Sequence, residues 1–153
     1  MREARSEDAE TLLAIQRDAS VAGFVRVFPP EEYPYPTDEV REVWRTTLAD
    51  PDVDVYVAEV DECPVGTVTV DNEFLRQLYV LPEHWGDGVG TALLERGLER
   101  MRERGATRAK LWTLQGNEPG RRFYERRGWT LTDETRVVPY PPNPIDVQYA
   151  IDL

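Results

Sequence analysis

The stretch Leu78–Leu94, LYVLPEHWGDGVGTALL, decides the fold. It starts as an apolar run of strand type, passes through the glycine-rich turn GDGVG, and continues into a helix predicted over residues 89–104. Such a loop presents several backbone N–H groups at the positive end of a helix dipole, which favours an anion. The stretch therefore predicts either an anion-binding loop or a tight strand-to-helix turn without a ligand.

Two well-known nucleotide-binding motifs do not fit this loop. A Walker loop requires Lys and then Ser or Thr after its last glycine, whereas Thr91 and Ala92 follow here. The dinucleotide fingerprint G-x-G-x-x-G has a different spacing and occurs in an early strand–helix–strand unit. Gly86, Gly88 and Gly90 are instead suited to a different diphosphate, because they allow close approach of the backbone.

A second decisive stretch is Asn117–Trp129, NEPGRRFYERRGW, which predicts a helix over residues 117–127 with Asn117 as its N-cap. Tyr124 follows Asn117 by seven positions, so at about 3.6 residues per turn the two side chains share one face. Phe123 then points elsewhere, toward the core. The pattern predicts a phenol and an amide at the same opening of the structure.

The remaining hydrophobic patterns place strands and helices on both sides of these stretches. Ser6 is the expected N-cap of the first helix. The periodicities predict strands over 2–5, 53–60, 65–70, 74–81, 108–114, 129–138 and 145–153, and helices over 7–20, 38–49, 89–104 and 117–127. This order indicates an α+β fold with a mixed sheet that is mainly antiparallel in its first half.

Length and composition favour one domain over residues 1–153. The chain has 153 residues, of which 41% are hydrophobic and 31% charged, and these values argue against a disordered or collagen-like chain. With the single cysteine Cys63 and the single histidine His84, it lacks the residues for a disulfide framework or a conventional zinc cage. No metal is therefore expected.

The charge balance and the hydropathy pattern restrict the partners. The chain carries 18 basic and 29 acidic side chains, a net charge of −11, which opposes nonspecific binding to nucleic acid or to an anionic membrane. No apolar run approaches the roughly 20 residues of a membrane-spanning helix, and the first residues lack the apolar core of a signal peptide. We therefore expect a cytoplasmic protein without a nucleic-acid or membrane partner.

Together, LYVLPEHWGDGVGTALL and LWTLQGNEPGRRFYERRGW resemble the two signature segments of the GCN5-related N-acetyltransferase (GNAT) superfamily. The first is similar to its R/Q-x-x-G-x-G/A acyl-CoA loop, and the second to its N-x-x-A-x-x-F-Y-x-x-x-G-F helix. The two segments span residues 78–129, about a third of the chain. The chain departs from the pattern at Trp85, where the family has Arg or Gln, and at Gly120, where it has Ala. Neither change removes a backbone donor.

The resemblance implies a GNAT-like α+β fold, with a central mixed, mostly antiparallel sheet of about seven strands flanked by about four helices. The sheet would splay between its fourth and fifth strands, and acetyl-CoA would enter the gap as the acetyl donor. The pantetheine arm would pair with the fourth strand, and the glycine loop would hold the pyrophosphate. The residues implied in binding the cofactor are Leu78, Tyr79, Val80, Gly86, Asp87, Gly88, Val89, Gly90, Thr91, Asn117 and Tyr124.

Catalysis requires one proton to leave the amine and another to reach the departing thiolate. Tyr124 is implied as the acid, because the pKa values of a phenol and a thiol differ by only about two units. Glu73 is the nearest acid on the strand before the loop and is the candidate base, although it needs a β-bulge to face the site. The alternatives are a chain of water molecules or the further acids Glu31, Glu32 and Asp71.

The function implied is that of an N-acetyltransferase that moves an acetyl group from acetyl-CoA to a primary amine of a small molecule, by direct transfer in a ternary complex. Two alternatives stay open: a non-catalytic sensor module that binds acyl-CoA, and acetylation of a peptide or protein amine. The presence of Tyr124 favours catalysis over sensing. A homodimer also stays open.

The resemblance to the GNAT superfamily also implies that the connection between the first two helices forms the acceptor side of the site. It carries Phe24, Phe28, Tyr33 and Tyr35 among four prolines, which predicts an aromatic wall for a small ligand. Two glutamates at positions 31 and 32, together with the net charge, would attract an ammonium group. We therefore expect an amine with an apolar or aromatic part; an ordinary packed connection is the alternative.

Overall fold

The computed structural model describes residues 1–25 and 28–153 of the chain. Its α-helices are α1 (Ala9–Gly23), α2 (Thr37–Ala49), α3 (Val89–Glu103) and α4 (Glu118–Glu125). Its strands are β1 (Arg2–Glu3), β2 (Asp54–Val60), β3 (Cys63–Val70), β4 (Leu75–Val80), β5 (Arg108–Leu114), β6 (Thr130–Val137) and β7 (Ile145–Asp152). None of the helices in the described residues has the length and apolarity that crossing a membrane requires.

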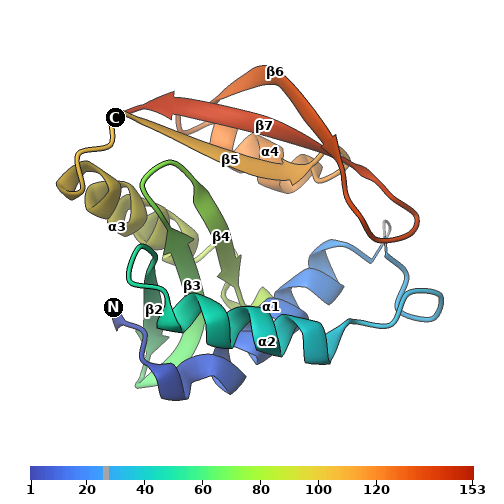
Figure 1. Ribbon diagram of the computed structural model, residues 1–153. Helices are drawn as coiled ribbons and strands as arrows, with labels where there is room; N and C mark the ends of the chain where they lie inside the picture. The colour runs from blue at the N-terminus through green and yellow to red at the C-terminus, as the bar shows by residue number, and fades with distance from the viewer. Residues whose placement is uncertain (26–27) are drawn as a thin grey trace.

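The strands form two antiparallel sheets that diverge from one another (Figure 1). The first sheet has the order β1-β2-β3-β4 and the second the order β5-β7-β6. The sheets meet where an isolated parallel bridge joins Phe74, just before β4, to Lys110 of β5. The expected α+β fold, with a splay between the fourth and fifth strands, is confirmed.

Helices cover both faces of the first sheet. Side chains alternate along β2, and Val55 and Val57 belong to the cluster beneath α1 and α2, whereas Tyr56 belongs to the cluster beneath α3. Trp44 of α2 is completely buried in the first of these clusters, and its indole N–H donates to Gln16 Oε1 of α1 (2.8 Å). Figure 1 shows α1 and α2 together on the same face.

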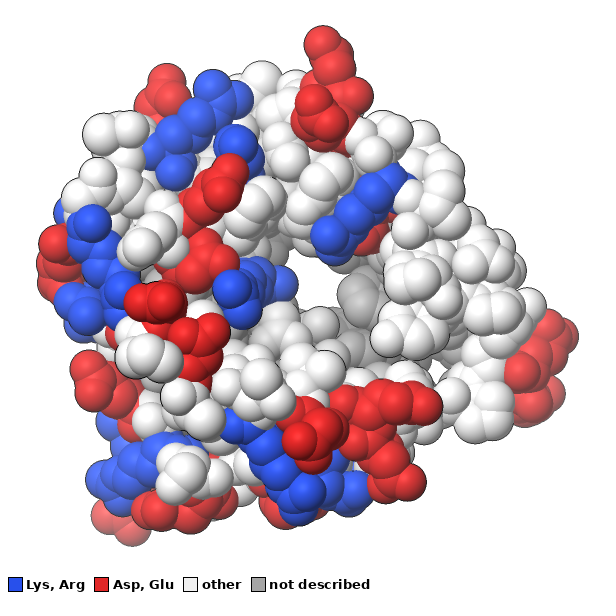
Figure 2. Space-filling model, in the orientation of Figure 1, with Lys and Arg blue, Asp and Glu red and all other residues white. Residues whose placement is uncertain are grey.

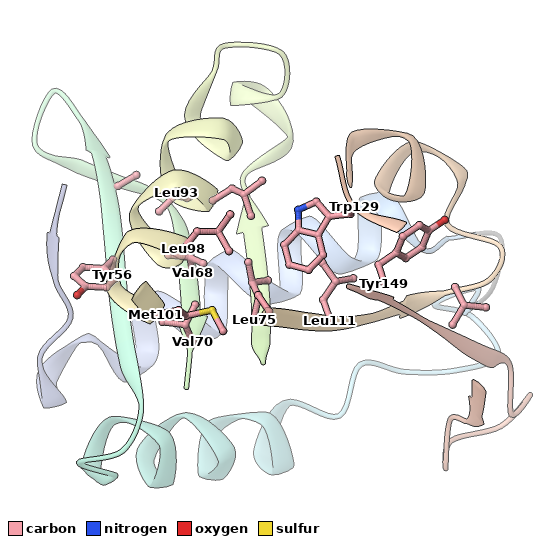
Figure 3. Packing of buried hydrophobic residues seen from close by; sticks show 14 of the residues in the cluster. Tyr56, Val68, Val70, Leu75, Leu93, Leu98, Met101, Leu111, Trp129 and Tyr149 are labelled. Carbon is pink, nitrogen blue, oxygen red and sulfur yellow. The ribbon is translucent and has the colours of Figure 1, made fainter. Parts of the chain in front are cut away.

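The larger core lies between the first sheet and α3 and continues under the second sheet (Figure 3). The buried leucine and methionine side chains of α3 recur at helical spacing, at Leu93, Leu94, Leu98 and Met101. Gly97 allows α3 to approach β3, because an added Cβ would lie only 3.0 Å from Val70 Cγ1. The residues that extend this core to the second sheet include Leu111, Trp129 and Tyr149.

The start of the first helix differs from the prediction. Ser6 is not its N-cap, because a 3₁₀ turn over Ser6–Asp8 leads into α1. The Asp8 carboxylate accepts the backbone N–H of Arg5 (2.6 Å) and two hydrogen bonds from the Arg2 guanidinium (2.9 and 3.0 Å). The carboxylate therefore ties the turn before α1 to Arg2 of β1, and the Asp8 side chain makes no capping hydrogen bond to α1. The other predicted elements agree with the structure to within three residues at each end.

Candidate active site

A cleft of about 800 Å³ opens where the two sheets diverge. β4 and β5 form its walls, and the loop after β4, the first turn of α3, and α4 form one end. The last residues of α1 also line the cleft, as do Arg136 of β6 and Asp146 of β7. Figure 2 shows a central hollow in this face of the molecule, with basic side chains on two opposite sides of it.

The edge of β4 that faces the cleft has backbone groups left over from the ladder with β3. The Leu81 N–H donates to Val65 O (2.8 Å), and antiparallel ladders alternate between hydrogen-bonded and non-hydrogen-bonded pairs. The backbone groups of Leu78 and Val80 therefore point away from β3. The Val80 carbonyl accepts the indole N–H of Trp85 (2.7 Å), whereas the N–H groups of the two residues face the cleft. An extended chain carrying amides can add to such an edge as a further strand.

A β-bulge interrupts β4 at the base of the cleft. The register with β3 shifts by one residue, which leaves Arg76 as the extra residue between Leu75 and Gln77. Arg76 lines the cleft, and its Nε donates to Asp71 Oδ2 (2.7 Å). The bulge that the sequence argument required for Glu73 therefore exists, but it brings an arginine to the cleft.

The glycine loop opens onto the cleft at the start of α3. Gly86 and Gly88 have φ values of +84° and +86°, in the left-handed region that favours glycine. The first helical hydrogen bond is donated by the Ala92 N–H to Gly88 O (3.1 Å), so the N–H groups of residues 89–91 have no acceptor within the helix. Gly86, Gly88, Gly90 and Thr91 line the cleft. The loop can therefore present several donors and a helix dipole to an anion.

Asn117 links α4 to β5 at the same end of the cleft. Its Oδ1 accepts the Gly120 N–H (3.2 Å), and its Nδ2 donates to Thr113 Oγ1 (3.2 Å). In the orientation that the Asn117 side chain adopts here, its amide lies where a Cβ at Gly120 would be. The expected N-cap is confirmed.

Tyr124 lies between the cleft and the core. Its ring packs edge-to-face against Phe123 and Trp129, with centroid distances of 5.3 and 5.7 Å, and the residue lines the cleft together with Asn117. Burial, with a smaller contribution from Tyr79, raises the pKa of Tyr124 above its ordinary value of 10. The phenol therefore keeps its proton at neutral pH and can act as a donor.

Tyr79 adds a second phenol on the α1 side of the cleft. Burial raises the pKa of Tyr79 to about 12, although the nearby polar groups of Ser20 and Gln16 on α1 oppose this rise. The backbone of Tyr79 pairs with Thr67 of β3, and the residue lines the cleft. Two protonated phenols, from β4 and from α4, are therefore brought to one space.

Three of the residues expected in the site lie outside the cleft lining. Glu73 is exposed, and its carboxylate is bound to Lys110 Nζ (2.9 Å). Asp87 is exposed, with its carboxylate 3.6 Å from His84 Nδ1, and Val89 packs against the main core. The structure therefore brings together the remaining predicted residues, on β4, the glycine loop and α4, but not these three.

The other acids considered as bases do not line the cleft either. Asp71 accepts the backbone N–H groups of Phe74 (2.6 Å) and Glu73 (2.7 Å). Burial alone would raise the pKa of Asp71. These hydrogen bonds and the Arg76 guanidinium outweigh that effect and hold the pKa of Asp71 below its usual value. Asp71 therefore stabilises the turn before β4 as an anion. Glu31 and Glu32 are exposed.

The expected aromatic wall is only partly at the cleft. Phe24 lines it, whereas Phe28 and Tyr33 stack edge-to-face with each other, with centroids 6.2 Å apart, and Tyr35 packs against the core beneath α1 and α2. Residues 26–27 of this connection lie outside the described residues. Of the four rings named from the sequence, one therefore reaches the cleft.

Three cleft residues of the second sheet were not identified as such from the sequence: Trp112, Arg136 and Asp146. Each lies on a predicted strand, and strand periodicity identifies the face of a residue but not the strands that pair beside it. Among the described residues, no group of three or more His, Cys, Asp or Glu side chains could hold a metal ion.

Comparison with known proteins identifies the family. The profile of the family described as the Acetyltransferase (GNAT) family matches residues 24–129, which include both cleft walls and α4. The chain belongs to the GNAT family. An uncharacterized N-acetyltransferase of Archaeoglobus fulgidus is 34% identical in an alignment 118 residues long, which covers 66% of this chain and 80% of that relative.

Solved GNAT structures share the fold over nearly the whole chain. The PaiA N-acetyltransferase from Thermoplasma acidophilum in complex with coenzyme A gives a TM-score of 0.73 at 19% identity, covering 96% of this chain and 95% of that one. The ribosomal-protein-S18-alanine N-acetyltransferase from Escherichia coli gives 0.76 at 16% identity, covering 98% and 90%. At these identities the likeness shows the fold alone. Membership of the GNAT family makes the chain an acetyl-CoA-dependent acyltransferase.

Proposed function

We propose that this GNAT protein transfers the acetyl group of acetyl-CoA to a primary amine of a small molecule, directly and in a ternary complex. One observation carries the proposal. The free N–H groups of Leu78 and Val80, the glycine loop and the Tyr124 phenol all open onto the same cleft. A strand edge, an anion site and a proton donor are the three features that an extended thioester with a pyrophosphate requires.

The donor would lie along β4. Its pantetheine amides would form hydrogen bonds with the edge of β4 at Leu78 and Val80. Its pyrophosphate would accept hydrogen bonds from the N–H groups at residues 86–91. Thr91 stands at the end of this loop, and its Oγ1 already accepts a hydrogen bond from Arg127 Nη2 (2.6 Å). This arginine adds positive charge beside the loop, which supports the placement of the pyrophosphate there.

The reaction needs one new bond and one broken bond. The neutral amine nitrogen attacks the thioester carbonyl carbon, and a backbone N–H of the Leu78–Val80 edge stabilises the oxyanion that develops. The C–N bond is then complete, the C–S bond breaks, and the products are an N-acetyl amine and the thiol of CoA. Tyr124 gives its proton to the sulfur and regains one from water. Burial raises the pKa of Tyr124, so the phenol is protonated when the thiolate departs.

The proton of the amine leaves through water. Glu73 was the residue expected as base, but its bond to Lys110 and its place outside the lining do not support that role. Asp146 is the only carboxylate that lines the cleft in the described residues, and it is paired with Arg136 (2.9 Å). A chain of water molecules is therefore proposed to accept the amine proton, which was one of the alternatives left open by the sequence.

Thiol release from acetyl-CoA, measured over a panel of small amines and peptides, tests the proposal. We expect release that depends on a small amine, with the N-acetyl product identified by mass spectrometry. Calorimetric binding of acetyl-CoA without thiol release for any acceptor would instead indicate a sensor module. Thiol release only with peptides would show that the acceptor is a protein or peptide amine.

A further inference from the structure

The charge of the cleft is opposite to that of the whole chain. The net charge is −11, yet within residues 1–25 and 28–153 the charged side chains that line the cleft are three arginines, Arg76, Arg127 and Arg136, and one acid, Asp146. Arg127 belongs to the end with the glycine loop, since it bonds to Thr91. Arg76 is bonded to Asp71 in the turn before β4. Arg136 requires a different explanation, because an ammonium acceptor alone gives no reason for it.

Arg136 is held in a fixed orientation from two sides. Its Nε donates to Asp146 Oδ2 (2.9 Å), and its guanidinium carbon lies 4.5 Å from the centre of the Trp112 ring. Arg136 and Asp146 are direct partners in the register of β6 and β7, and Asp146 is only 8% exposed. The two strands and the ring therefore orient the guanidinium before any ligand arrives.

The terminal nitrogens of Arg136 remain available. The side chain is 54% exposed, and Nε is its only atom with a hydrogen-bond partner in the described part of the chain. A guanidinium held through Nε and through its ring contact leaves Nη1 and Nη2 as a planar fork that matches a carboxylate in a bidentate pair. Because Asp146 already offsets part of the charge, a monoanion suits this fork better than a phosphate dianion.

This fork lies on the side of the second sheet that faces away from α4. Thr113 faces α4, because its Oγ1 accepts a hydrogen bond from Asn117. Side chains alternate along a strand, so Trp112 and Leu114 point to the opposite face, and Asp146 shares that face as the direct partner of Leu114. The phosphate end of the donor would occupy the α3 and α4 side. A group bound by the fork therefore belongs to the acceptor.

We propose that the acceptor is an amine that also carries a carboxylate, such as an amino acid, and that Arg136 binds this carboxylate. The inference rests on the proposed function and specifies its substrate class. Asp146 and Trp112 act as positioning residues for Arg136. The aromatic or apolar part expected of the acceptor would lie against Phe24 and Trp112, which line the same cleft.

Matched acceptors test this proposal. Amino acids are compared with the amines that lack only their carboxylate, such as phenylalanine with phenethylamine. We expect kcat/KM to be about tenfold or more higher for the carboxylated member of the best pair, the scale of a charge-assisted hydrogen-bond pair. A preference for the decarboxylated amines in the wild-type protein would overturn the proposal.

Two substitutions at Arg136 locate the effect. Arg136→Met should raise KM for the carboxylated acceptor by about tenfold or more, with KM for acetyl-CoA and activity on the decarboxylated amine unchanged. Arg136→Lys keeps the charge but not the planar fork, so its KM for the carboxylated acceptor should lie between those of the wild type and Arg136→Met. The matched control is Arg41→Met, because Arg41 also donates through Nε to a carboxylate, that of Glu10 (2.6 Å), and does not line the cleft.

A second variant separates recognition from folding. Arg136→Met leaves the buried Asp146 carboxylate without its partner, so it is repeated together with Asp146→Asn and checked by thermal melting. A rise in KM that is the same for acceptors with and without a carboxylate would contradict the proposal. If acetyl-CoA binds but no amine is acetylated, the proposed function itself fails; if amines are acetylated without regard to a carboxylate, only this inference fails.

Discussion

Gly88 and Gly105 stand just outside the two ends of α3 and allow a matched test of the glycine loop. Their φ values are +86° and +89°, and a Cβ added at either would meet no atom within 4 Å. Gly88→Val and Gly105→Val should therefore destabilise the protein through backbone strain alone, by about 2 kcal/mol each. For a chain of this size, that corresponds to a fall in Tm of about 4–8 °C.

Only Gly88 lines the cleft, so only its variant should affect the donor. A valine side chain at the start of α3 would keep a pyrophosphate from the N–H groups of residues 89–91. Isothermal titration calorimetry should show CoA affinity weaker by about tenfold or more in Gly88→Val, equivalent to about 1.4 kcal/mol or more. Gly105→Val should bind CoA as the wild type does. Its backbone strain is equal to that of Gly88→Val, but it lies at the other end of α3, away from the cleft.

Two results would refute this reasoning. Equal losses of CoA affinity in the two variants would show that destabilisation, rather than obstruction of the loop, weakens binding. Unchanged CoA affinity in a folded Gly88→Val variant would show that the pyrophosphate does not approach this loop. Melting curves recorded on the same samples establish that each variant is folded at the temperature of the titration.

Three further predictions concern catalysis and stability. Tyr124→Phe should lower kcat by about 10²-fold with little change in CoA affinity, and full turnover would show that solvent protonates the thiolate. Gly66→Ala should lower stability by about 1–3 kcal/mol in urea unfolding, because its Cβ would lie 2.8 Å from Leu93 Cδ1; an unchanged midpoint would show that α3 can shift. The pKa of Asp8 is lowered by its hydrogen bonds with Arg2, so this carboxylate stabilises the fold above about pH 4 and the effect is lost as pH falls through the lowered pKa. Asp8→Asn should therefore flatten the loss of stability in acid, and identical profiles for variant and wild type would contradict this.

Local signals identified most of the fold and one end of the site. The left-handed glycines, the Asn117 cap and the helical spacing of Tyr124 each depend on residues within about two turns of one another. Interactions of that range are encoded in consecutive residues, so they can be recognised without knowing what packs nearby. The predicted cap at Ser6 was wrong because Arg2, from the adjacent strand, binds Asp8 and favours a different start for α1.

The candidate base shows where local reasoning ends. Glu73 was placed near the site on the condition of a bulge, and the bulge is present at Arg76. The side chain that reaches the cleft is nevertheless the arginine, since Glu73 is bound to Lys110 of the neighbouring sheet. The register between strands and the partners across the sheet decide such an outcome, and neither follows from the alternation of one strand.

The sequence by itself therefore determined the α+β class, the order of the elements, and the glycine loop and α4 that form one end of the cleft. Only the tertiary structure placed Arg136, Asp146 and Trp112 together. These residues come from three strands, and their contact depends on β7 pairing between β5 and β6. The physical reason is that a strand encodes which side chains share a face, whereas long-range pairing decides which strand lies beside it.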